Sequence, residues 1–367
     1  MITAMKKLLV CVGTRPNLIK ITQLERSIRL LGGVDYKLLH TGQHHDASMS
    51  GVFFEELGIR PPDFSLDIHG GSSVEMISRI MTSFESFVVD YKPDLVVVPG
   101  DVNSSFACAF VASRHGIPVA HVESGLRSFD RTMPEEVNRV LVDALSELCF
   151  VTEPSGTRNL LREGKDPASL RYVGNSMIDA LVAFMPSIDK SRVRERLQVN
   201  DYHLVTFHRP SNVDRPDRLR VVARILGEVA ARRTVVFPVH PRTRKRLQEF
   251  GLERAIAANV IVTDPLGYID FISLAKNARA VLTDSGGVQE ETTFLGVPCV
   301  TLRENTERPI TVDEGTNTLC PLESSAIQRV LSSIEAGDYK KGTVPALWDG
   351  RASERIANAA RDFLTGR

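Results

Sequence analysis

The chain has 367 residues, enough for two hydrophobic cores, since a single core stops growing at roughly 250–300 residues. Hydrophobic residues make up 43% and charged residues 25%, which is typical of a soluble globular protein. The 45 lysine and arginine residues balance 45 aspartate and glutamate residues, and this zero net charge argues against a general binder of nucleic acid or of membrane surfaces.

The sequence predicts a cytoplasmic protein. Its five cysteines are scattered, without a Cys-x-x-C pair or a metal-ligand spacing, so we interpret them as reduced core thiols. The apolar run after Lys6 and Lys7 is too short for a signal peptide and continues into Gly13, which is typical of a first strand. No segment approaches the roughly 20 apolar residues that are needed to cross a bilayer.

Along the first half of the chain, short apolar runs alternate with longer segments of helical period. This alternation predicts βαβ units and a parallel sheet that is covered by helices on both faces. The predicted strands are residues 8–12, 36–39, 95–99, 119–122 and 149–152. The predicted helices are residues 18–31, 74–91, 104–114 and 135–146.

The pattern restarts in the second half, so we predict an α/β protein with two Rossmann-like domains and a central cleft. Residues 1–180 are expected to form the first domain and residues 181–345 the second, while the amphipathic residues 346–367 cross back to the first as a C-terminal helix. Ligands of open α/β sheets bind at the carboxyl ends of the strands, where we therefore expect the function. The predicted strands of this half are residues 203–207, 234–238, 260–263, 280–283 and 299–302.

The first predicted strand is followed by Gly-Thr-Arg-Pro at residues 13–16, a strand-to-helix corner with proline at the first helical position. Exposed amides at such a helix start suit an anion, and Arg15 and Lys20 add positive charge. A simple turn with surface cations explains the same residues equally well.

Acidic residues follow the later strands of this half. Asp101 and Glu123 come directly after two consecutive predicted strands, where a carboxylate is either a helix cap or a functional group. Asp101 could cap the following helix, whereas Glu123 has no helix to cap, so we interpret Glu123 as functional. Glu135 and Glu136 stand at a predicted helix start, where the helix dipole favours acidic residues. This structural explanation of their presence is stronger for Glu136 than for Glu135.

In the second half, His208 and His240 each follow a predicted strand, and each lies close to an arginine in the sequence. A lone histidine is more often a structural group. Two histidines at equivalent strand ends favour contact with a ligand.

The strongest local signal is Ser285-Gly286-Gly287, where a predicted strand ends and a helix begins. Such a turn forms a backbone cradle for phosphate at a helix N-terminus. Glu291 lies one turn further along, where a carboxylate can accept hydrogen bonds from ribose hydroxyls. Neither the dinucleotide fingerprint G-x-G-x-x-G nor a Walker motif occurs.

In their combination and order, these motifs resemble those of the non-hydrolysing UDP-N-acetylglucosamine 2-epimerases, over nearly the whole chain. The matching motifs are G-T-R-P-x-x-I-K (13–20), T-G-Q-H (41–44), G-D (100–101), H-V-E-x-G-L-R (121–127), P-E-E-x-N-R (134–139), G-N (174–175), H-R-x-x-N (208–212), D-S-G-G-x-Q-E-E (284–291) and T-E-R-P (306–309).

The resemblance implies a GT-B-like fold and reversible epimerisation of UDP-N-acetylglucosamine to UDP-N-acetylmannosamine, through elimination of UDP to a 2-acetamidoglucal and its re-addition. It also implies that no metal or NAD cofactor is needed, a homodimer, and a role in polysaccharide biosynthesis. The catalytic positions it implies are Asp101, Glu123, Glu135 and His208. The substrate-binding positions are Arg15, Lys20, Arg139, His240, Phe271, Ser285, Gly286, Gly287, Glu291 and Arg308, with Ser285 to Gly287 on the diphosphate, Glu291 on the ribose and Phe271 near the uridine.

Some positions depart from the family pattern. Asn17 and Ser211 stand where many members carry glutamate, and residues 45–49 differ from those of members that bind a second UDP-sugar as activator, so the sequence does not predict such activation. The substrate stays open between UDP-N-acetylglucosamine and a modified UDP-amino sugar, such as a 2,3-diacetamido uronic acid or a 6-deoxy sugar. The alternative functions are a GT-B glycosyltransferase, a hydrolysing relative that releases free N-acetylmannosamine, and a non-catalytic UDP-sugar-binding regulator.

Overall fold

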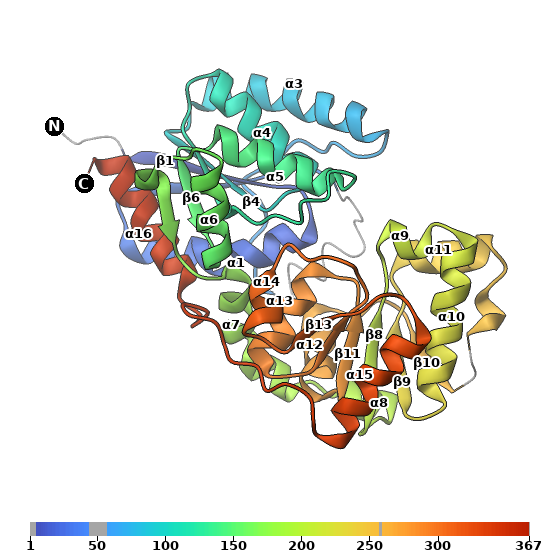
Figure 1. Cartoon of the computed structure of the whole chain (residues 1–367). Coiled ribbons are helices and arrows are strands. Elements are labelled where there is room, and N and C mark those ends of the chain that lie inside the picture. Colours follow the sequence, from blue (N-terminus) through green and yellow to red (C-terminus); the bar gives the residue numbers. More distant parts are fainter. Residues whose placement is uncertain (1–4, 44–56, 257–258, 367) are drawn as a thin grey trace. The chain divides into compact units, whose positions relative to one another are not determined.

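The computed structural model describes residues 5–43, 57–256 and 259–366, and the chain divides into two compact units (Figure 1). Unit 1 comprises residues 1–183 and 346–367, and unit 2 comprises residues 184–345. Each unit is built around one parallel sheet with helices against it. The prediction of two Rossmann-like α/β domains is therefore confirmed. No helix within the described ranges is long and apolar enough to cross a membrane.

Unit 1 contains a sheet of order β3-β2-β1-β4-β5-β6-β7, in which all strand pairs are parallel. Its strands are β1 (Lys6–Val12), β2 (Val34–His40), β3 (Phe64–Ser65), β4 (Leu95–Pro99), β5 (Val119–Ser124), β6 (Leu148–Val151) and β7 (Leu170–Tyr172). Its helices are α1 (Arg15–Leu31), α3 (Ser73–Tyr91), α4 (Asn103–Arg114), α5 (Pro134–Leu145), α6 (Pro154–Arg162), the first part of α7 (Ser176–Lys190) and α16 (Ala352–Thr365).

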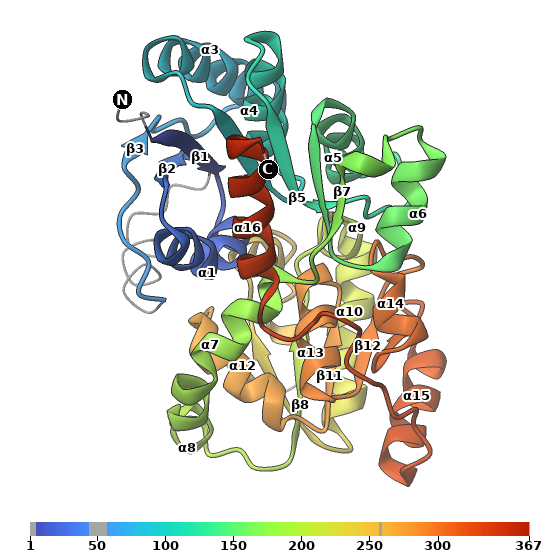
Figure 2. The same cartoon turned by 90° about the vertical axis from the view of Figure 1, so that its left-hand side faces the viewer.

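The C-terminal helix α16 packs against α1, beside the sheet of unit 1 (Figure 2). Two buried groups fix the returning chain. The carboxylate of Asp179 accepts hydrogen bonds from the backbone N–H groups of Ala352 (3.0 Å) and Ser353, and the indole of Trp348 donates to the carbonyl of Thr152 at 3.1 Å. The predicted return of the C-terminal helix to the first domain is thus confirmed.

Unit 2 contains a sheet of order β10-β9-β8-β11-β12-β13, which is also parallel throughout. Its strands are β8 (Tyr202–Thr206), β9 (Thr234–Pro238), β10 (Val260–Thr263), β11 (Ala280–Thr283), β12 (Cys299–Thr301) and β13 (Asn317–Leu319). Its helices are the rest of α7, α8 (Val193–Leu197), α9 (Pro210–Val213), α10 (Pro216–Ala230), α11 (Pro241–Glu249), α12 (Tyr268–Asn277), α13 (Gly286–Leu295), α14 (Pro309–Asp313) and α15 (Ser324–Ala336).

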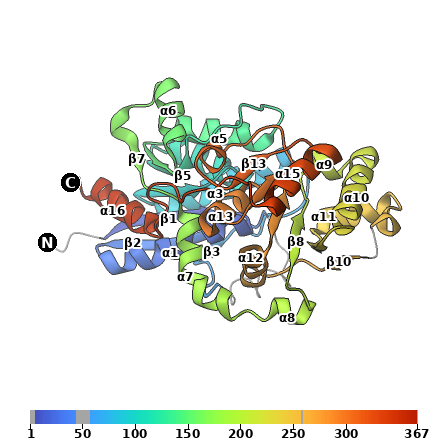
Figure 3. The same cartoon turned by 60° about the horizontal axis from the view of Figure 1, so that its bottom comes forward.

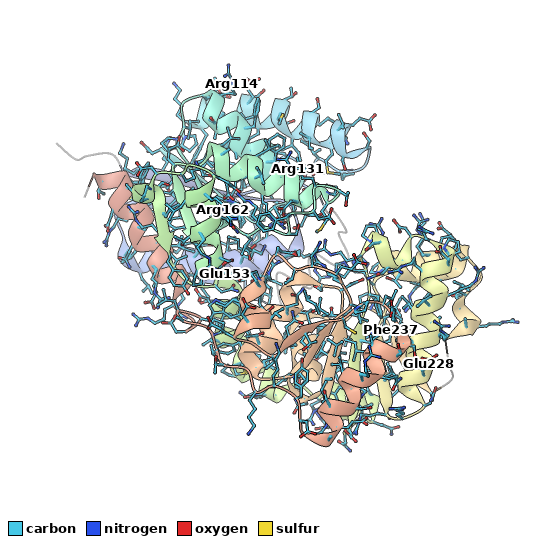
Figure 4. All side chains as sticks on the ribbon, in the orientation of Figure 1. Arg114, Arg131, Glu153, Arg162, Glu228 and Phe237 are labelled. Atoms are coloured by element: carbon cyan, nitrogen blue, oxygen red, sulfur yellow. The ribbon has the colours of Figure 1, made fainter. Side chains whose placement is uncertain are left out.

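Both faces of the unit 2 sheet are buried, because successive residues of a strand point to opposite sides. On β11, Val281 packs with residues of α8, α12 and α13, whereas Leu282 packs with residues of α10, α11 and α15. Figure 3 shows β8 between α12 and α10, and Figure 4 labels Phe237 of β9, which lies in the same cluster as Leu282. This two-sided core explains why the strands read as continuous apolar runs in the sequence.

The strands β3, β7 and β13 were not predicted from the sequence. Each has only two or three residues, too few to show an apolar run. The remaining strands agree with the predicted ones to within about two residues at each end, which is the usual uncertainty of element boundaries. One of these differences affects the site, since β5 continues to Ser124 and therefore includes Glu123.

Candidate active site

In unit 1, Asp101 and Glu123 lie beside each other at the carboxyl ends of two paired strands. Pro99 of β4 is opposite Val122 of β5, and the N–H of Gly100 donates to the carbonyl of Val122 at 2.9 Å. Glu123 has a φ of 75° where the β5 pairing shifts register. A left-handed conformation is unfavourable for a residue with a side chain and is often found at functional sites. The bulge thus redirects this carboxylate away from regular strand geometry.

Glu123 forms a buried ion pair with Lys20 of α1, with 2.5 Å between Oε2 and Nζ and side-chain exposures of 2% and 9%. Gly100 leaves room for this pair, because a Cβ at that position would lie 2.7 Å from Nζ of Lys20. The alternative of a turn with surface cations is therefore wrong for Lys20, which lies inside the unit. Arg15, at the first position of α1, is half-buried.

Asn17, the first departure from the family pattern, connects the corner after β1 to the end of β4. Its Oδ1 accepts a hydrogen bond from the hydroxyl of Thr14 at 2.9 Å, and its Nδ2 donates to the carbonyl of Pro99 at 2.9 Å. This role of Asn17 was not predicted from the sequence. The signal that could have found it is its position within the motif, between Gly13 and Lys20.

Asp101 is held by α5 and does not cap α4. The N-cap of α4 is Val102 and lacks a side-chain capping bond, so the predicted alternative of a helix cap is wrong. The guanidinium of Arg139 bridges the carboxylates of Asp101 and Glu136, and Nδ2 of Asn138 donates to the carbonyl of Asp101 at 2.9 Å. One helix thus fixes both the side chain and the backbone of Asp101.

The adjacent residues Glu135 and Glu136 have different environments. Glu136 is buried and accepts hydrogen bonds at 2.9 Å from the hydroxyl and the N–H of Ser128 and from the N–H of Phe129. Glu135 is half-buried in the first turn of the same helix. A structural explanation is therefore stronger for Glu136, as the sequence predicted.

In unit 2, the fully buried Asp284 organises the strand ends. Its carboxylate accepts hydrogen bonds from the backbone N–H groups of His208 and Arg209, both at 3.0 Å, and from Nδ2 of Asn212 at 3.1 Å. These bonds connect the segment after β8 to the segment after β11. Asp284 belongs to a predicted motif, yet the sequence did not identify this structural role.

The structure brings together the two histidines that the sequence singled out. The ring centroids of His208 and His240 are 5.3 Å apart. Nδ1 of His240 accepts a hydrogen bond from the N–H of Arg242 at 3.2 Å and so caps α11. The proton of a neutral His240 ring is therefore on Nε2.

The Ser285-Gly286-Gly287 segment forms the N-terminus of α13. The Ser285 side chain makes no capping bond, and the first amides of a helix have no partner within it. A Cβ on Gly286 would lie 2.7 Å from Nη1 of Arg308, so glycine allows the guanidinium to approach the start of the helix. Backbone amides, the positive end of the helix dipole and a guanidinium together favour an anion at this position.

Arg308 belongs to a charged cluster that the sequence predicted only in part. It pairs with Glu290 at 2.9 Å and with Glu307 at 3.0 Å, and Glu307 also pairs with Arg303 at 2.8 Å and with Arg209 at 3.4 Å. Three arginines therefore face two glutamates. Arg308 brings this cluster close to the N-terminus of α13, and burial lowers the pKa of Arg303.

Glu291 is buried in α13, and burial raises the pKa of its carboxyl to about 8. A hydrogen bond with Tyr268 partly offsets this rise, whereas the charge of Glu290 adds to it. Tyr268 begins α12, the helix that also carries the half-buried Phe271. The two residues predicted for ribose and uridine therefore come from neighbouring helices of unit 2. Tyr268 was missed because a tyrosine at a helix start has no distinctive sequence signal.

Two further predictions concern metals and activation. Within the described residues, no group of three or more His, Cys, Asp or Glu side chains could hold a metal ion. Residues 45–49, on which the prediction about an activating second UDP-sugar rests, lie outside the described residues, as does His44 of the T-G-Q-H motif.

Comparison with known proteins shows similarity along nearly the whole chain. The family model described as UDP-N-acetylglucosamine 2-epimerase matches residues 26–361. The UDP-N-acetylglucosamine 2-epimerase of Methanocaldococcus jannaschii is 40% identical over 360 residues, which cover 95% of this chain and 97% of that protein. The UDP-2,3-diacetamido-2,3-dideoxy-D-glucuronate 2-epimerase of Pseudomonas aeruginosa is 41% identical over 356 residues, which cover 96% and 98%.

A solved structure shows the same similarity. The crystal structure of the Methanocaldococcus jannaschii UDP-GlcNAc 2-epimerase in complex with UDP-GlcNAc and UDP aligns with a TM-score of 0.90 at 40% identity, covering 97% of this chain and 99% of that chain. The similarity therefore includes both units and is not limited to the motifs.

Proposed function

Because the chain belongs to the UDP-N-acetylglucosamine 2-epimerase family, we propose that it interconverts UDP-N-acetylglucosamine and UDP-N-acetylmannosamine. The observation that carries the proposal is the pair of carboxylates at adjacent strand ends in unit 1, each paired with a buried cation. Inversion of a sugar carbon needs acid and base groups of this kind. The proposed substrate also contains a diphosphate. The charged cluster and the helix N-terminus of unit 2 favour an anion and so support the binding of this group.

The proposed reaction proceeds by elimination and re-addition. The proton on carbon 2 of the sugar has no neighbouring carbonyl to activate it, so direct removal is difficult. Loss of UDP breaks the bond between the anomeric carbon and the phosphate oxygen, and removal of the carbon 2 proton completes a 2-acetamidoglucal. Positive charge builds at the anomeric carbon in the process, and nearby carboxylates stabilise it. Re-addition of UDP, with a proton delivered to the opposite face of carbon 2, inverts that carbon.

In this scheme Asp101, Glu123, Glu135 and His208 are the proposed acid and base groups. Asp101 and Glu123 are supported by their placement at the strand ends, and His208 by its position after β8. Glu135 is supported by its half-buried place at the start of α5. The base and the acid are not assigned individually among the three carboxylates. Lys20 and Arg139 hold two of them, Glu123 and Asp101, in position.

The departing UDP must be retained so that it can attack again. We assign its diphosphate to Ser285, Gly286 and Gly287 at the N-terminus of α13, with Arg308, Arg15 and His240 as further contacts. Glu291 is assigned to the ribose and Phe271 to the uridine. The anion-favouring geometry of the α13 start supports the first of these assignments.

A second candidate substrate follows from the comparison. The relative named for UDP-2,3-diacetamido-2,3-dideoxy-D-glucuronate is 41% identical, against 40% for the relative named for UDP-N-acetylglucosamine, so overall identity does not separate the two substrates. The uronate carries an additional carboxylate on carbon 5 and an acetamido group on carbon 3. The same elimination and re-addition can act on the uronate, because its two additional groups lie away from carbons 1 and 2, where the reaction takes place.

The test is proton NMR of each UDP-sugar with the protein in deuterium oxide, without added metal or NAD. UDP-N-acetylmannosamine with deuterium at carbon 2 is the expected product of UDP-N-acetylglucosamine. Turnover of the diacetamido uronate alone would assign the second substrate. Free N-acetylmannosamine would indicate the hydrolysing reaction, and no reaction of either sugar would favour a glycosyltransferase or a binding protein.

The proposed enzyme is a homodimer that uses an apolar surface of unit 1. Phe110 of α4 and Val137 and Leu141 of α5 are 39–43% exposed, and the two helices pack side by side (Figure 1). A contiguous exposed apolar patch marks an interaction site, and we propose that these three side chains belong to one. Sedimentation equilibrium of the wild type and of Leu141→Glu tests this, since a monomeric wild type would refute the dimer.

A further inference from the structure

Two residues of the H-V-E-x-G-L-R motif have no part in the chemistry proposed above. His121 is completely buried on β5, and Arg127, which follows the strand, is 3% exposed. Neither can reach a substrate in solvent-accessible space. Their presence in the motif that carries Glu123 suggests that they act on that residue indirectly.

Both residues bind the same carboxylate, that of Asp143 on α5. Nδ1 of His121 lies 2.6 Å from Oδ1 of Asp143, and Nη1 of Arg127 lies 2.7 Å from Oδ2. Burial alone would raise the pKa of Asp143, but the charges and hydrogen bonds of His121 and Arg127 lower it below its ordinary value. Arg127 in turn forms a bidentate pair with Glu163, at 2.8 and 2.6 Å.

The other nitrogen of His121, Nε2, lies 2.9 Å from the carbonyl of Gly100. A carboxylate and a carbonyl are both acceptors, so the ring makes both bonds only when each nitrogen carries a proton. His121 and Arg127 thus enclose the buried carboxylate of Asp143, while Glu163, whose side chain is 39% exposed, forms the outer end of the network.

The network holds the two turns that carry the proposed catalytic carboxylates. Gly100, bound through its carbonyl, directly precedes Asp101. Gly125, whose N–H donates to Oδ2 of Asp143 at 3.0 Å, lies two residues after Glu123. Both turns are therefore attached to Asp143, one of them through the ring of His121.

The turn after Glu123 is also attached to α6, whose ends are marked by Glu153 and Arg162 in Figure 4. Nδ2 of Asn159 donates to the carbonyl of Gly125 at 2.9 Å. A Cβ on Gly125, which has a φ of 81°, would lie 2.4 Å from the carbonyl oxygen of Gly156. The backbone on either side of the strained Glu123 thus has little freedom to move.

We propose that His121 and Asp143 are positioning residues, which hold Asp101 and Glu123 in the relative placement that proton transfer at carbon 2 requires. The inference rests on the proposed epimerase function and adds to it. Displacement of a reacting group by about 1 Å can lower turnover by roughly 100-fold. Loss of the network should therefore lower kcat while leaving UDP binding, whose proposed contacts lie mainly in unit 2, unchanged.

Two substitutions of His121 separate its two hydrogen bonds. The amide of His121→Gln is long enough to donate to the carbonyl of Gly100, whereas that of His121→Asn reaches Asp143 only. We expect kcat to fall by about 10-fold to 100-fold in His121→Asn and Asp143→Asn, and by less in His121→Gln. In all three variants, KM and the Kd for UDP should change by less than about threefold.

The matched control is Asp179→Asn, another buried carboxylate of unit 1 that accepts two backbone N–H bonds, from Ala352 and Ser353. It should lower the melting temperature as Asp143→Asn does but leave kcat within about twofold of the wild type. If kcat of Asp143→Asn and His121→Asn also stayed within twofold, measured at equal folded fraction, the positioning role would be refuted.

Hydrogen exchange tests the network independently of turnover. We expect faster exchange in residues 99–103 and 119–127 in the His121 and Asp143 variants, and in residues 352–356 only in Asp179→Asn. Unchanged exchange in the first two segments would overturn the inference even if activity fell. An inactive wild type would refute the proposed function, while the exchange pattern would still decide whether His121 and Asp143 hold these turns.

Discussion

Lys20 of α1 and Glu123 of β5 form a buried ion pair, with 2.5 Å between Nζ and Oε2, although 103 positions separate them along the chain. The pair joins the first strand-to-helix corner of unit 1 to the bulge that presents Glu123. Its burial distinguishes it from the many surface pairs of this protein and makes its effect on stability measurable.

Removal of the cation should destabilise the protein, because Lys20→Met leaves the Glu123 carboxylate buried without its partner. We expect the free energy of unfolding to fall by about 3–5 kcal/mol, the range for broken buried pairs. The double variant Lys20→Met/Glu123→Gln removes the unpaired charge and should recover at least half of the loss. Urea unfolding measures both.

The exposed pair between Lys6 and Asp94, at 2.8 Å, provides the control. Its side chains are 49% and 32% exposed, so Lys6→Met should change the free energy of unfolding by less than about 1 kcal/mol. Equal losses in the Lys6 and Lys20 variants would contradict the importance of burial.

Glu123→Gln should lower turnover by roughly 10²–10⁴-fold, the usual contribution of one acid or base group. The amide oxygen can still accept a hydrogen bond from Lys20, so the variant should remain folded. UDP binding, measured by calorimetry, should be unchanged because the proposed UDP contacts are mainly in unit 2. Near-normal turnover would remove Glu123 from the mechanism.

Gly286→Ala should weaken the binding of UDP. The new Cβ would lie 2.7 Å from Nη1 of Arg308 and must displace the guanidinium from the start of α13. We expect the Kd for UDP to rise about 10-fold, equivalent to about 1.4 kcal/mol. Calorimetric titration checks this. Gly116→Ala, at a turn whose φ of 66° strains an added Cβ although no other atom lies near it, controls for a general loss of stability and should leave the Kd unchanged. An unchanged Kd would argue against a diphosphate at this helix start.

Glu291 should make stability fall as pH rises. Its carboxyl has a pKa of about 8 in the folded protein, against 4.5 as its ordinary value. Between these values the folded state keeps a proton that the unfolded state has released, so stability decreases as pH rises through this window. Glu291→Gln, which imitates the protonated form, should lose this part of the pH dependence. A variant with the same pH profile of unfolding as the wild type would refute the assignment.

The raised pKa of Glu291 also leads us to expect that UDP binding releases a proton. Ribose hydroxyls donate to a carboxylate and favour its ionised form, so the pKa of Glu291 should fall in the complex. Binding at pH 7 should then strengthen as pH rises toward 8. Calorimetry in two buffers of different ionisation enthalpy measures the released proton, and Glu291→Gln should abolish it.

The sequence was most informative about the strand ends. Asp101, Glu123, His208 and His240 were predicted to lie there because parallel strands place their carboxyl ends at one edge of a sheet, and this needs only the order of strands and loops. The short strands β3, β7 and β13 were missed since two or three residues carry no periodic pattern.

The sequence alone determined the α/β class, two Rossmann-like domains and the set of polar residues that follow their strands, because hydrophobic period and turn residues are local properties. Only the tertiary structure decided which of these residues meet. Asp101 binds Arg139 and does not cap its helix, and His121 shares Asp143 with Arg127. Such pairings depend on how α5 packs against the sheet, and side-chain packing over tens of residues leaves no periodic trace in the sequence.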